Sequence, residues 1–404
     1  MKRVRHKYTN RRRCLYSTLC FIIGCSVLII KFSWYDAQRS ICLPKNPDDE
    51  IIDRQDEWQY QNGITGQWYH WRTVYKRRNN QTEWRANWLN AAPKSYLGVI
   101  VYLATFGDLK SLQTSLTQLS RMLSNNPRPV AIFHEDDLSN NDIQQSLAQI
   151  LGNSTPLTFE HIKFSNISIQ PGRLHRRWAP KYFHMCRFFT LMLPNHPLLT
   201  LFSYYWRLDT HSYVFGGQPI EDPFEIMQKR KTQYAFTMAN RDNEVHTIGL
   251  WTFFHQFLQD HCLKPSKNFL KTQPGWIDSY STAIFFTNLA IANVSLFRDH
   301  PLIRAWLHRV DRSGNIYRYR WGDAPVHTLI LTQLIPRNQI LRLRYFGYMH
   351  RNEYVCAKGI KDDLCKAQIK TVFPDPNLIF YNHPGGCNPS FGNPLCHYYP
   401  EITL

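Results

Sequence analysis

The chain has no internal repeat, and its cysteines show no convincing zinc-binding spacing. Without a repeat, the long C-terminal part is expected to bury one large core with insertions. Without a zinc pattern, the ten cysteines are candidates for disulfide bonds or for free thiols.

Acidic residues are scarce beside basic ones, 30 against 48, which gives a formal net charge of +18. Seven of the basic residues lie within the first thirteen positions. A basic chain raises the possibility of nucleic-acid binding. The lumenal location that the N-terminal residues predict excludes nucleic-acid binding, because a lumenal chain does not meet nucleic acid. The remaining excess suits an anionic ligand such as a nucleoside diphosphate, although a generally basic, solvated surface accounts for most of these residues.

An apolar stretch follows the basic tail, and no small-x-small cleavage site comes after it. The stretch from 14 to 30 is short for a membrane span, but Phe32 and Trp34 extend it with aromatic residues that suit the membrane interface. We therefore predict a cytosolic tail over 1–13 and a signal-anchor helix over 14–34, with the rest of the chain in the lumen as a single-pass type II protein.

The lumenal part is predicted to divide near Pro93. The region 35–94 contains five tryptophans, which is unusual for a disordered linker, so we expect a partly packed stem. The region 95–404 is expected to be the catalytic domain. Its last four cysteines would staple a loop-rich tail in an oxidising compartment, with a pairing that the sequence leaves open: Cys356, Cys365, Cys387 and Cys396. Four sequons fit a secretory route: Asn80, Asn153, Asn166 and Asn293.

From residue 98 the pattern alternates between strands and helices. Residues 98–105 and 129–133 are short apolar runs typical of buried strands. Leucines spaced along 109–123 and apolar residues along 143–151 form helical stripes. This alternation predicts an α/β domain with a mostly parallel sheet and helices on both faces.

The stretch Arg320–His327 is the most informative part of the chain. Asp323 can cap a helix, Pro325 suits its first turn, and 329–334 supplies the apolar continuation. His327 would lie on that first turn, where the positive helix end favours phosphate. Taken alone, the stretch is more simply a capped helix with a packed histidine.

A second motif, Tyr205–Asp209, changes the balance. Apolar and aromatic residues lead into a carboxylate, as if a buried strand delivered Asp209 at its end. Ligands of open α/β sheets bind beyond the carboxyl ends of the strands. A carboxylate there suits a divalent cation, and Arg207 suits a phosphate.

Together the two motifs resemble the fungal-type Golgi α-1,2-mannosyltransferases, glycosyltransferase family 15. That family has Tyr-Trp-Arg-Val-Glu-Pro at the first site and Arg-Trp-Gly-Asp-Ala-Pro-Val-His at the second, and the second match is complete here. The likeness runs in family order over about 96–356 and includes these further segments: 185–188, 222–224, 234–237, 247–251 and 347–350.

The resemblance implies a Rossmann-like nucleotide-sugar fold of the GT-A type and a Golgi enzyme. The enzyme would move mannose from GDP-mannose to a mannose hydroxyl of a glycan acceptor, with retention and an α-1,2 linkage. Asp209 and His327 would be the metal ligands, and Mn²⁺ accepts this mixed oxygen and nitrogen pair better than Mg²⁺ does. A buried Asp–His hydrogen bond without metal is the structural alternative. Four residues would contact the donor or the sugars: Arg207, Arg320, Trp321 and Asp323. Each of three has a structural alternative, a salt bridge for Arg207, a place in the core for Trp321 and a helix cap for Asp323.

Two departures from the family pattern bear on catalysis. Asp209 stands where the family has Glu, and Ala290 stands where it has a Glu that is a candidate nucleophile. Ala290 can neither attack nor take a proton. Asp242, which lies near an acidic position of the family, or Asp209 would then assist, or the reaction would be a front-face displacement.

The departures also keep alternatives open. The chain could be a catalytically weakened relative that binds nucleotide or glycan without efficient turnover. A third possibility, a basic adaptor at a membrane surface, rests on charge alone.

Overall fold

The computed structural model describes residues 42–51, 67–69, 97–152, 155–164, 169–176, 178–216, 220–273, 280–372, 381–382 and 395–402. The predicted tail, the signal anchor and most of the stem lie outside these residues. No helix within the described part is long and apolar enough to cross a membrane.

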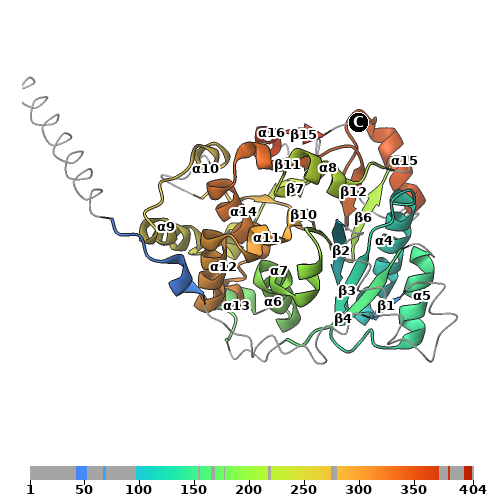
Figure 1. The fold of residues 1–404 in the computed structure, drawn as a ribbon, viewed down its shortest axis with the longest axis horizontal. Helices are drawn as coiled ribbons and strands as arrows, with labels where there is room; N and C mark the ends of the chain where they lie inside the picture. The colour runs from blue at the N-terminus through green and yellow to red at the C-terminus, as the bar shows by residue number, and fades with distance from the viewer. Residues whose placement is uncertain are drawn as a thin grey trace, which may run out of the picture. The chain divides into compact units, whose positions relative to one another are not determined.

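A mixed sheet forms the centre of the larger unit (Figure 1). Among the described residues it has nine strands, in this spatial order: β1 (Gln67–Tyr69), β4 (Leu157–His161), β3 (Val130–His134), β2 (Gly98–Leu103), β5 (Tyr204–Leu208), β10 (Leu289–Asn293), β7 (Tyr234–Phe236), β11 (Ile340–Leu343) and β15 (Glu401–Ile402). The pairs from β4 to β5 and from β7 to β15 are parallel, whereas β10 runs antiparallel to both of its neighbours. The prediction of a mostly parallel sheet is confirmed.

Helices cover both faces of this sheet because the side chains of a strand alternate. Ile132 points into the core that α4 (Leu109–Met122) and α5 (Asn141–Leu151) share. Its neighbour Phe133 points the other way, with its ring centroid 5.2 Å from that of Phe188. Phe188 opens a π-helical turn, Phe188–Met192, between α6 (Pro180–Arg187) and α7 (Leu193–Asn195).

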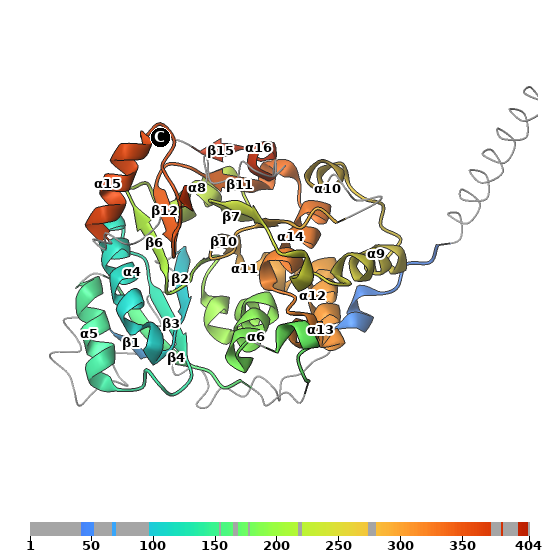
Figure 2. The same cartoon turned by 180° about the vertical axis from the view of Figure 1, so that it is seen from behind.

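The remaining helices lie in the second half of the chain (Figures 1 and 2). They are α8 (Pro223–Arg230), α9 (Leu250–Asp260), α10 (Lys267–Thr272), α11 (Val294–Arg298), α12 (Pro301–Ser313), α13 (Asn315–Tyr319), α14 (Asp323–Leu334), α15 (Asp362–Val372) and α16 (Leu395–Tyr398). Helix α14 is the one that the Arg320–His327 motif predicts. Gly322, rather than Asp323, occupies its N-cap position, and Asp323 is its first residue.

Two smaller sheets complete the strands of the described residues. One has the order β14 (Tyr381–Asn382), β13 (Glu353–Val355), β12 (Gly347–His350) and β6 (Ser212–Phe215), and the other pairs β8 (Ala239–Arg241) with β9 (Ala283–Phe285). Strand β6 follows β5 after a three-residue turn, and β12 runs antiparallel to it. This arrangement brings the end of β12 beside the end of β5.

A second, smaller unit comprises 1–46 and 258–264. In its described part, Cys42 and Cys262 form a disulfide bond, and the backbone N–H of Lys45 donates to the carbonyl of Asp260 at 2.9 Å. In the larger unit Cys356 pairs with Cys365, and Cys186 is a buried free thiol. The side chains of Cys387 and Cys396 lie outside the described residues.

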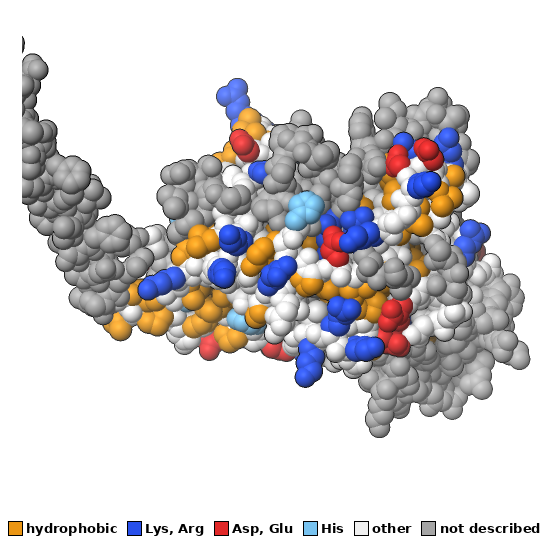
Figure 3. Space-filling view, turned by 90° about the horizontal axis from the view of Figure 1, so that it is seen from above, with side chains coloured by type: hydrophobic (Ala, Val, Ile, Leu, Met, Phe, Trp, Pro, Cys, Tyr) orange, Lys and Arg blue, Asp and Glu red, His pale blue; other side chains and the backbone are white. Residues whose placement is uncertain are grey.

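Lys and Arg side chains are spread over the face seen in Figure 3, between apolar and uncharged surface. They do not gather into a single stripe on that face. This distribution agrees with a generally basic, solvated surface.

Candidate functional site

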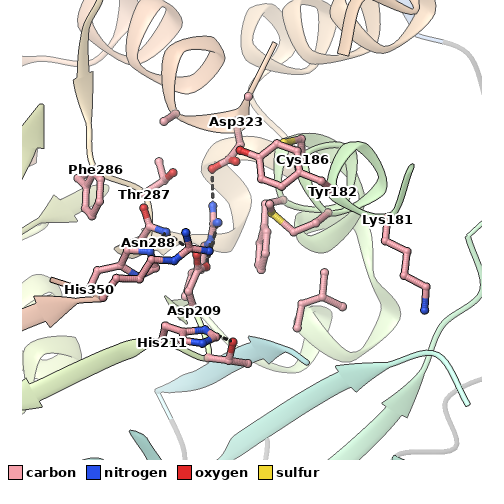
Figure 4. A pocket seen from close by; sticks show the side chains of 18 of the residues that line it. Lys181, Tyr182, Cys186, Asp209, His211, Phe286, Thr287, Asn288, Asp323 and His350 are labelled. Carbon is pink, nitrogen blue, oxygen red and sulfur yellow. Dashed lines mark hydrogen bonds and ion pairs between the residues drawn. The ribbon is translucent and has the colours of Figure 1, made fainter. Parts of the chain in front are cut away.

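A cavity of about 650 Å³ lies where β2 and β5 end, and it contains most of the residues that the two motifs single out. Its wall includes Arg207 and Asp209 from the first motif, and Arg320 and Asp323 from the second. Figure 4 shows Asp209 and Asp323 in this cavity, with His350 of β12 on the opposite side from Tyr182 of α6. The position beyond the carboxyl ends of parallel strands is the one expected for ligands of open α/β sheets.

Arg207 is the structural centre of this wall. Its buried guanidinium donates to Asp323 Oδ2 and to Asp209 Oδ1, the latter at 3.0 Å from Nη2, and it lies 3.5 Å above the ring centroid of Phe189. Burial works against the charge, but the carboxylates of Asp323 and Asp209 outweigh it and raise the pKa of Arg207. Burial likewise opposes the charge of Asp323, and Arg207 nevertheless lowers the pKa of that carboxyl. Arg207 therefore fixes two carboxylates at the cavity.

Asp209 and His350 converge on one point. The Asn288 amide Nδ2 donates to Asp209 Oδ2 and lies 3.3 Å from His350 Nε2 (Figure 4). Burial lowers the pKa of His350 to about 4, although Asp209 acts in the opposite direction, so the ring is neutral at pH 7. A carboxylate oxygen and an unprotonated imidazole nitrogen that face the same small space are the donor set of a mixed oxygen and nitrogen metal site.

His350 was missed by the sequence argument. The segment Gly347–His350 is part of the family likeness, yet its histidine was given no chemical role. One local signal could have found His350, because this histidine ends a short apolar run, as Asp209 does. Nothing local in the sequence shows that β12 ends beside β5.

The structure places His327 elsewhere, within the core. The imidazole Nε2 lies 3.0 Å from the carbonyl oxygen of Thr190, and the ring stacks on Phe297 with centroids 4.4 Å apart. A carbonyl oxygen only accepts, so Nε2 carries the proton. Burial lowers the pKa of His327, although Asp323 acts against it.

His327 does not line the cavity. The expected metal pair of Asp209 and His327 is therefore not what this fold brings together. Among the described residues no three His, Cys, Asp or Glu side chains group as a metal site.

The structure places Trp321 in the core, which was the alternative to a position at the sugar site. Its side chain is buried, its Nε1 donates to the carbonyl of Ile248 at 2.9 Å, and it is not part of the cavity wall. The aromatic residues of the wall include Trp178 and Tyr182, which sequence reasoning did not single out.

Arg320 and Asp242, two of the candidate site residues, both line the cavity. Arg320 adopts a left-handed backbone conformation with φ of 58°, and its guanidinium lies 4.4 Å above Trp178 and 4.8 Å above Tyr182. Its Nη1 is 3.9 Å from Asp242 Oδ1, and His246 Nδ1 approaches the same oxygen at 3.6 Å. A non-glycine residue held in this conformation at a cavity is a frequent mark of a functional position.

Ala290 lies beneath the site. It is directly opposite Arg207 in the antiparallel pair of β10 and β5, it is buried, and it does not line the cavity. Directly opposed residues share one face of the sheet. A carboxylate at 290 would therefore meet the Arg207 guanidinium, whose partners in this chain are Asp209 and Asp323.

Comparison with known proteins identifies the family to which this chain belongs. A family model described as glycolipid 2-alpha-mannosyltransferase matches residues 173–377. The O-glycoside alpha-1,2-mannosyltransferase omh1 of Schizosaccharomyces pombe is 25% identical over 342 residues, covering 76% of this chain and 85% of that protein. Alpha-1,2 mannosyltransferase KTR1 of Saccharomyces cerevisiae is 30% identical over 216 residues, about half of each chain (52% and 53%).

Among solved structures, core-mannan synthase A from Aspergillus fumigatus in a Mn/GDP form superposes with a TM-score of 0.58 at 22% identity, covering 65% of this chain and 78% of that one. This likeness shows a shared fold, the nucleotide-sugar glycosyltransferase type that the family resemblance implies. The chain belongs to the glycolipid 2-alpha-mannosyltransferase family, the fungal-type mannosyltransferases that its motifs resemble.

Proposed function

We propose that the protein transfers mannose from GDP-mannose to a mannose hydroxyl of a glycan, with an α-1,2 linkage and retention of configuration. The observation that carries this proposal is the convergence of Asp209 and His350 in the cavity beyond β5. A cavity of about 650 Å³ is large enough for a nucleotide-sugar donor. The names of the relatives, an α-1,2-mannosyltransferase and a Mn/GDP form of a mannan synthase, support the donor and the linkage.

The residues present fit a divalent cation, for which Mn²⁺ is the candidate. Asp209 Oδ2 and His350 Nε2 already share one polar partner, the Asn288 amide, so both direct a lone pair to the same place. Asp209 and His350 would hold the ion, and the Asn288 N–H would turn away. When bound, the ion would neutralise the diphosphate leaving group.

The chain's own residues hold the rest of the site. Arg207 forms ion pairs with Asp209 and Asp323 and holds both side chains in place, so little reorganisation is needed when the substrate binds. Arg320, stacked on Trp178 and Tyr182, offers a cation on the wall of the cavity. Asp242, whose Oδ1 lies 3.9 Å from Arg320 Nη1 and 3.6 Å from His246 Nδ1, is the carboxylate we propose to orient the acceptor hydroxyl without taking its proton.

Retention follows from front-face displacement in this proposal, because Ala290 supplies no carboxylate for a covalent intermediate. The bond from the anomeric carbon to the diphosphate oxygen breaks while the bond to the acceptor oxygen forms on the same face. The acceptor proton passes to the departing phosphate oxygen. The net products are the mannosylated glycan and GDP.

We further propose a Golgi location with the N-terminal anchor in the membrane and residues 95–404 in the lumen. The pairs Cys42–Cys262 and Cys356–Cys365 support an oxidising compartment. In microsomes, attached glycans at Asn80, Asn153 or Asn166 and protection of the C-terminal part from added protease are the expected results. Bare sequons together with digestion in intact vesicles would contradict the orientation.

The direct test of function uses the full-length chain with GDP-mannose, Mn²⁺ and a mannose-terminated acceptor. We expect GDP release matched by a product whose new linkage is α-1,2 by NMR, and loss of both with Asp209→Asn. The alternative, a relative that binds without efficient turnover, predicts GDP binding and no product in the same assay.

A further inference from the structure

Ser212 lies beside His350 on the neighbouring strand. The two residues are directly opposite in the antiparallel pair of β6 and β12, and Ser212 is fully buried. The hydroxyl Oγ of Ser212 has three polar neighbours: the Asn288 carbonyl oxygen at 3.1 Å, the Tyr348 hydroxyl at 2.8 Å and His350 Nδ1 at 3.2 Å.

All three contacts can be hydrogen bonds at once in only one proton arrangement. A carbonyl oxygen cannot donate, so the single Ser212 proton goes to Asn288. The Ser212 oxygen then accepts from the other two partners, which are the Tyr348 hydroxyl and His350 Nδ1. The ring of His350 therefore carries its proton on Nδ1.

The far side of the ring gives the same answer independently. The Asp209 carboxylate only accepts, so the Asn288 atom facing it is the amide nitrogen. That amide also lies 3.3 Å from His350 Nε2, which must accept from it. Nε2 is thus unprotonated, with its lone pair directed at the space it shares with Asp209.

We propose that Ser212 is a positioning residue that sets the tautomer and the aim of His350, so that Nε2 is ready to bind a cation. The use of that lone pair rests on the proposed function. A cation beside Asp209 would displace the Asn288 N–H, which would remove one of the two constraints on the ring. Ser212 would then be the remaining constraint on the ring. In metal sites generally, the partner of the other ring nitrogen fixes the tautomer and the orientation of the histidine.

Ser212 is itself held firmly. Ser115 Oγ of α4 donates to the Ser212 carbonyl at 2.6 Å, and the Tyr102 hydroxyl lies 2.9 Å from Ser115 Oγ. The backbone N–H of Ser212 donates to the carbonyl of Asp209 at 2.9 Å, closing the turn that joins β5 to β6. One short turn therefore links the proposed carboxylate ligand to the residue that aims the proposed imidazole ligand.

The test compares Ser212→Ala with Tyr348→Phe in the full-length protein. Both changes remove one hydroxyl from the same buried group, but only Ser212→Ala takes away the partner of His350 Nδ1. We expect Ser212→Ala to weaken Mn²⁺ binding about 10–100-fold in the presence of GDP, and Tyr348→Phe to change it less than about threefold. Equal Mn²⁺ affinity in wild type and Ser212→Ala would overturn the proposal while leaving the proposed function intact.

A second measurement needs neither metal nor turnover. In protein with ¹⁵N-labelled histidine, His350 of the metal-free wild type should show a protonated Nδ1 and an unprotonated Nε2, and Ser212→Ala should change that pattern. A wild-type spectrum with the proton on Nε2 would overturn the proposal even if the variant does not fold. The predicted tautomer in a protein that binds no Mn²⁺ would support the orientation by Ser212 and contradict the proposed function instead.

Discussion

Two buried histidines, His327 on α14 and His350 on β12, have similar surroundings and different uses. Burial lowers the pKa of both, and in both an aspartate acts in the opposite direction, Asp323 for one and Asp209 for the other. His327 directs Nε2 at the carbonyl of Thr190, whereas His350 directs Nε2 at an amide that Asp209 shares. The first nitrogen carries a proton and the second offers a lone pair.

The difference shows that a buried histidine near a carboxylate is not yet a metal ligand. The group that faces each ring nitrogen determines whether this nitrogen can bind a metal. A nitrogen that faces a carbonyl carries a proton, whereas one that faces an N–H has a free lone pair. Thr190 lies in the π-helical turn, where the regular helical hydrogen-bond pattern is interrupted, and its carbonyl holds His327 in the core.

The largest expected effect separates the two histidines by turnover. His350→Ala should lower metal-dependent kcat/KM by about 10³-fold, because losing one ligand leaves the diphosphate charge poorly neutralised, an effect of several kcal/mol. Transfer rates at saturating and limiting Mn²⁺ measure it.

Retained activity with unchanged Mn²⁺ dependence in His350→Ala would remove this residue from the site. Arg351→Ala provides the matched control, since this neighbour also lines the cavity but has no contact with the Asn288 amide among the described interactions.

His327→Ala should act on stability instead. The change leaves a cavity against Phe297 and an unpaired carbonyl at Thr190, so we expect the free energy of unfolding to fall by about 2–4 kcal/mol. Urea unfolding measures the loss, and the folded fraction should keep its Mn²⁺ dependence. A stable variant that has lost metal dependence would restore His327 as a ligand.

The sequence predicted this site unevenly, for physical reasons. The structure brings Asp209, Arg320 and Asp323 to one cavity, and the sequence could single them out because each lies within one of the two short motifs. His350 needs a long-range fact, the pairing of β12 with β6, which no local pattern contains. Trp321 looks like a sugar-contacting residue beside Arg320, but the left-handed backbone at Arg320 turns the chain there, and the next side chain points into the core.

A smaller effect concerns pH. Because burial lowers the pKa of His327, the unfolded chain binds protons more readily than the native state as pH falls below the ordinary histidine value of about 6.5. The stability that the neutral ring contributes is present above that value and is lost as pH falls through the lowered pKa. His327→Gln, which keeps an N–H donor for Thr190, should therefore lose less stability than wild type between pH 7 and pH 5 in urea unfolding. An equal loss of unfolding free energy in the variant and in wild type over this pH range would contradict a lowered pKa of His327.

The smallest expected effect is that of Ala290→Glu on rate. The new carboxylate would meet the Arg207 guanidinium, which Asp209 and Asp323 already pair with, so kcat should change by less than about fivefold. A slow fluorinated donor should give no covalent adduct with wild type. A large rate gain in Ala290→Glu would instead favour the weakened-relative alternative over an active enzyme.

The most direct test of the account is Mn²⁺ binding by the full-length protein with GDP, followed by the electron paramagnetic resonance signal of free Mn²⁺. Wild type and His327→Gln should bind with similar affinity, and His350→Gln should bind at least about tenfold more weakly, because only His350 directs a lone pair at the space beside Asp209. Normal binding by His350→Gln together with lost binding by His327→Gln would contradict the account.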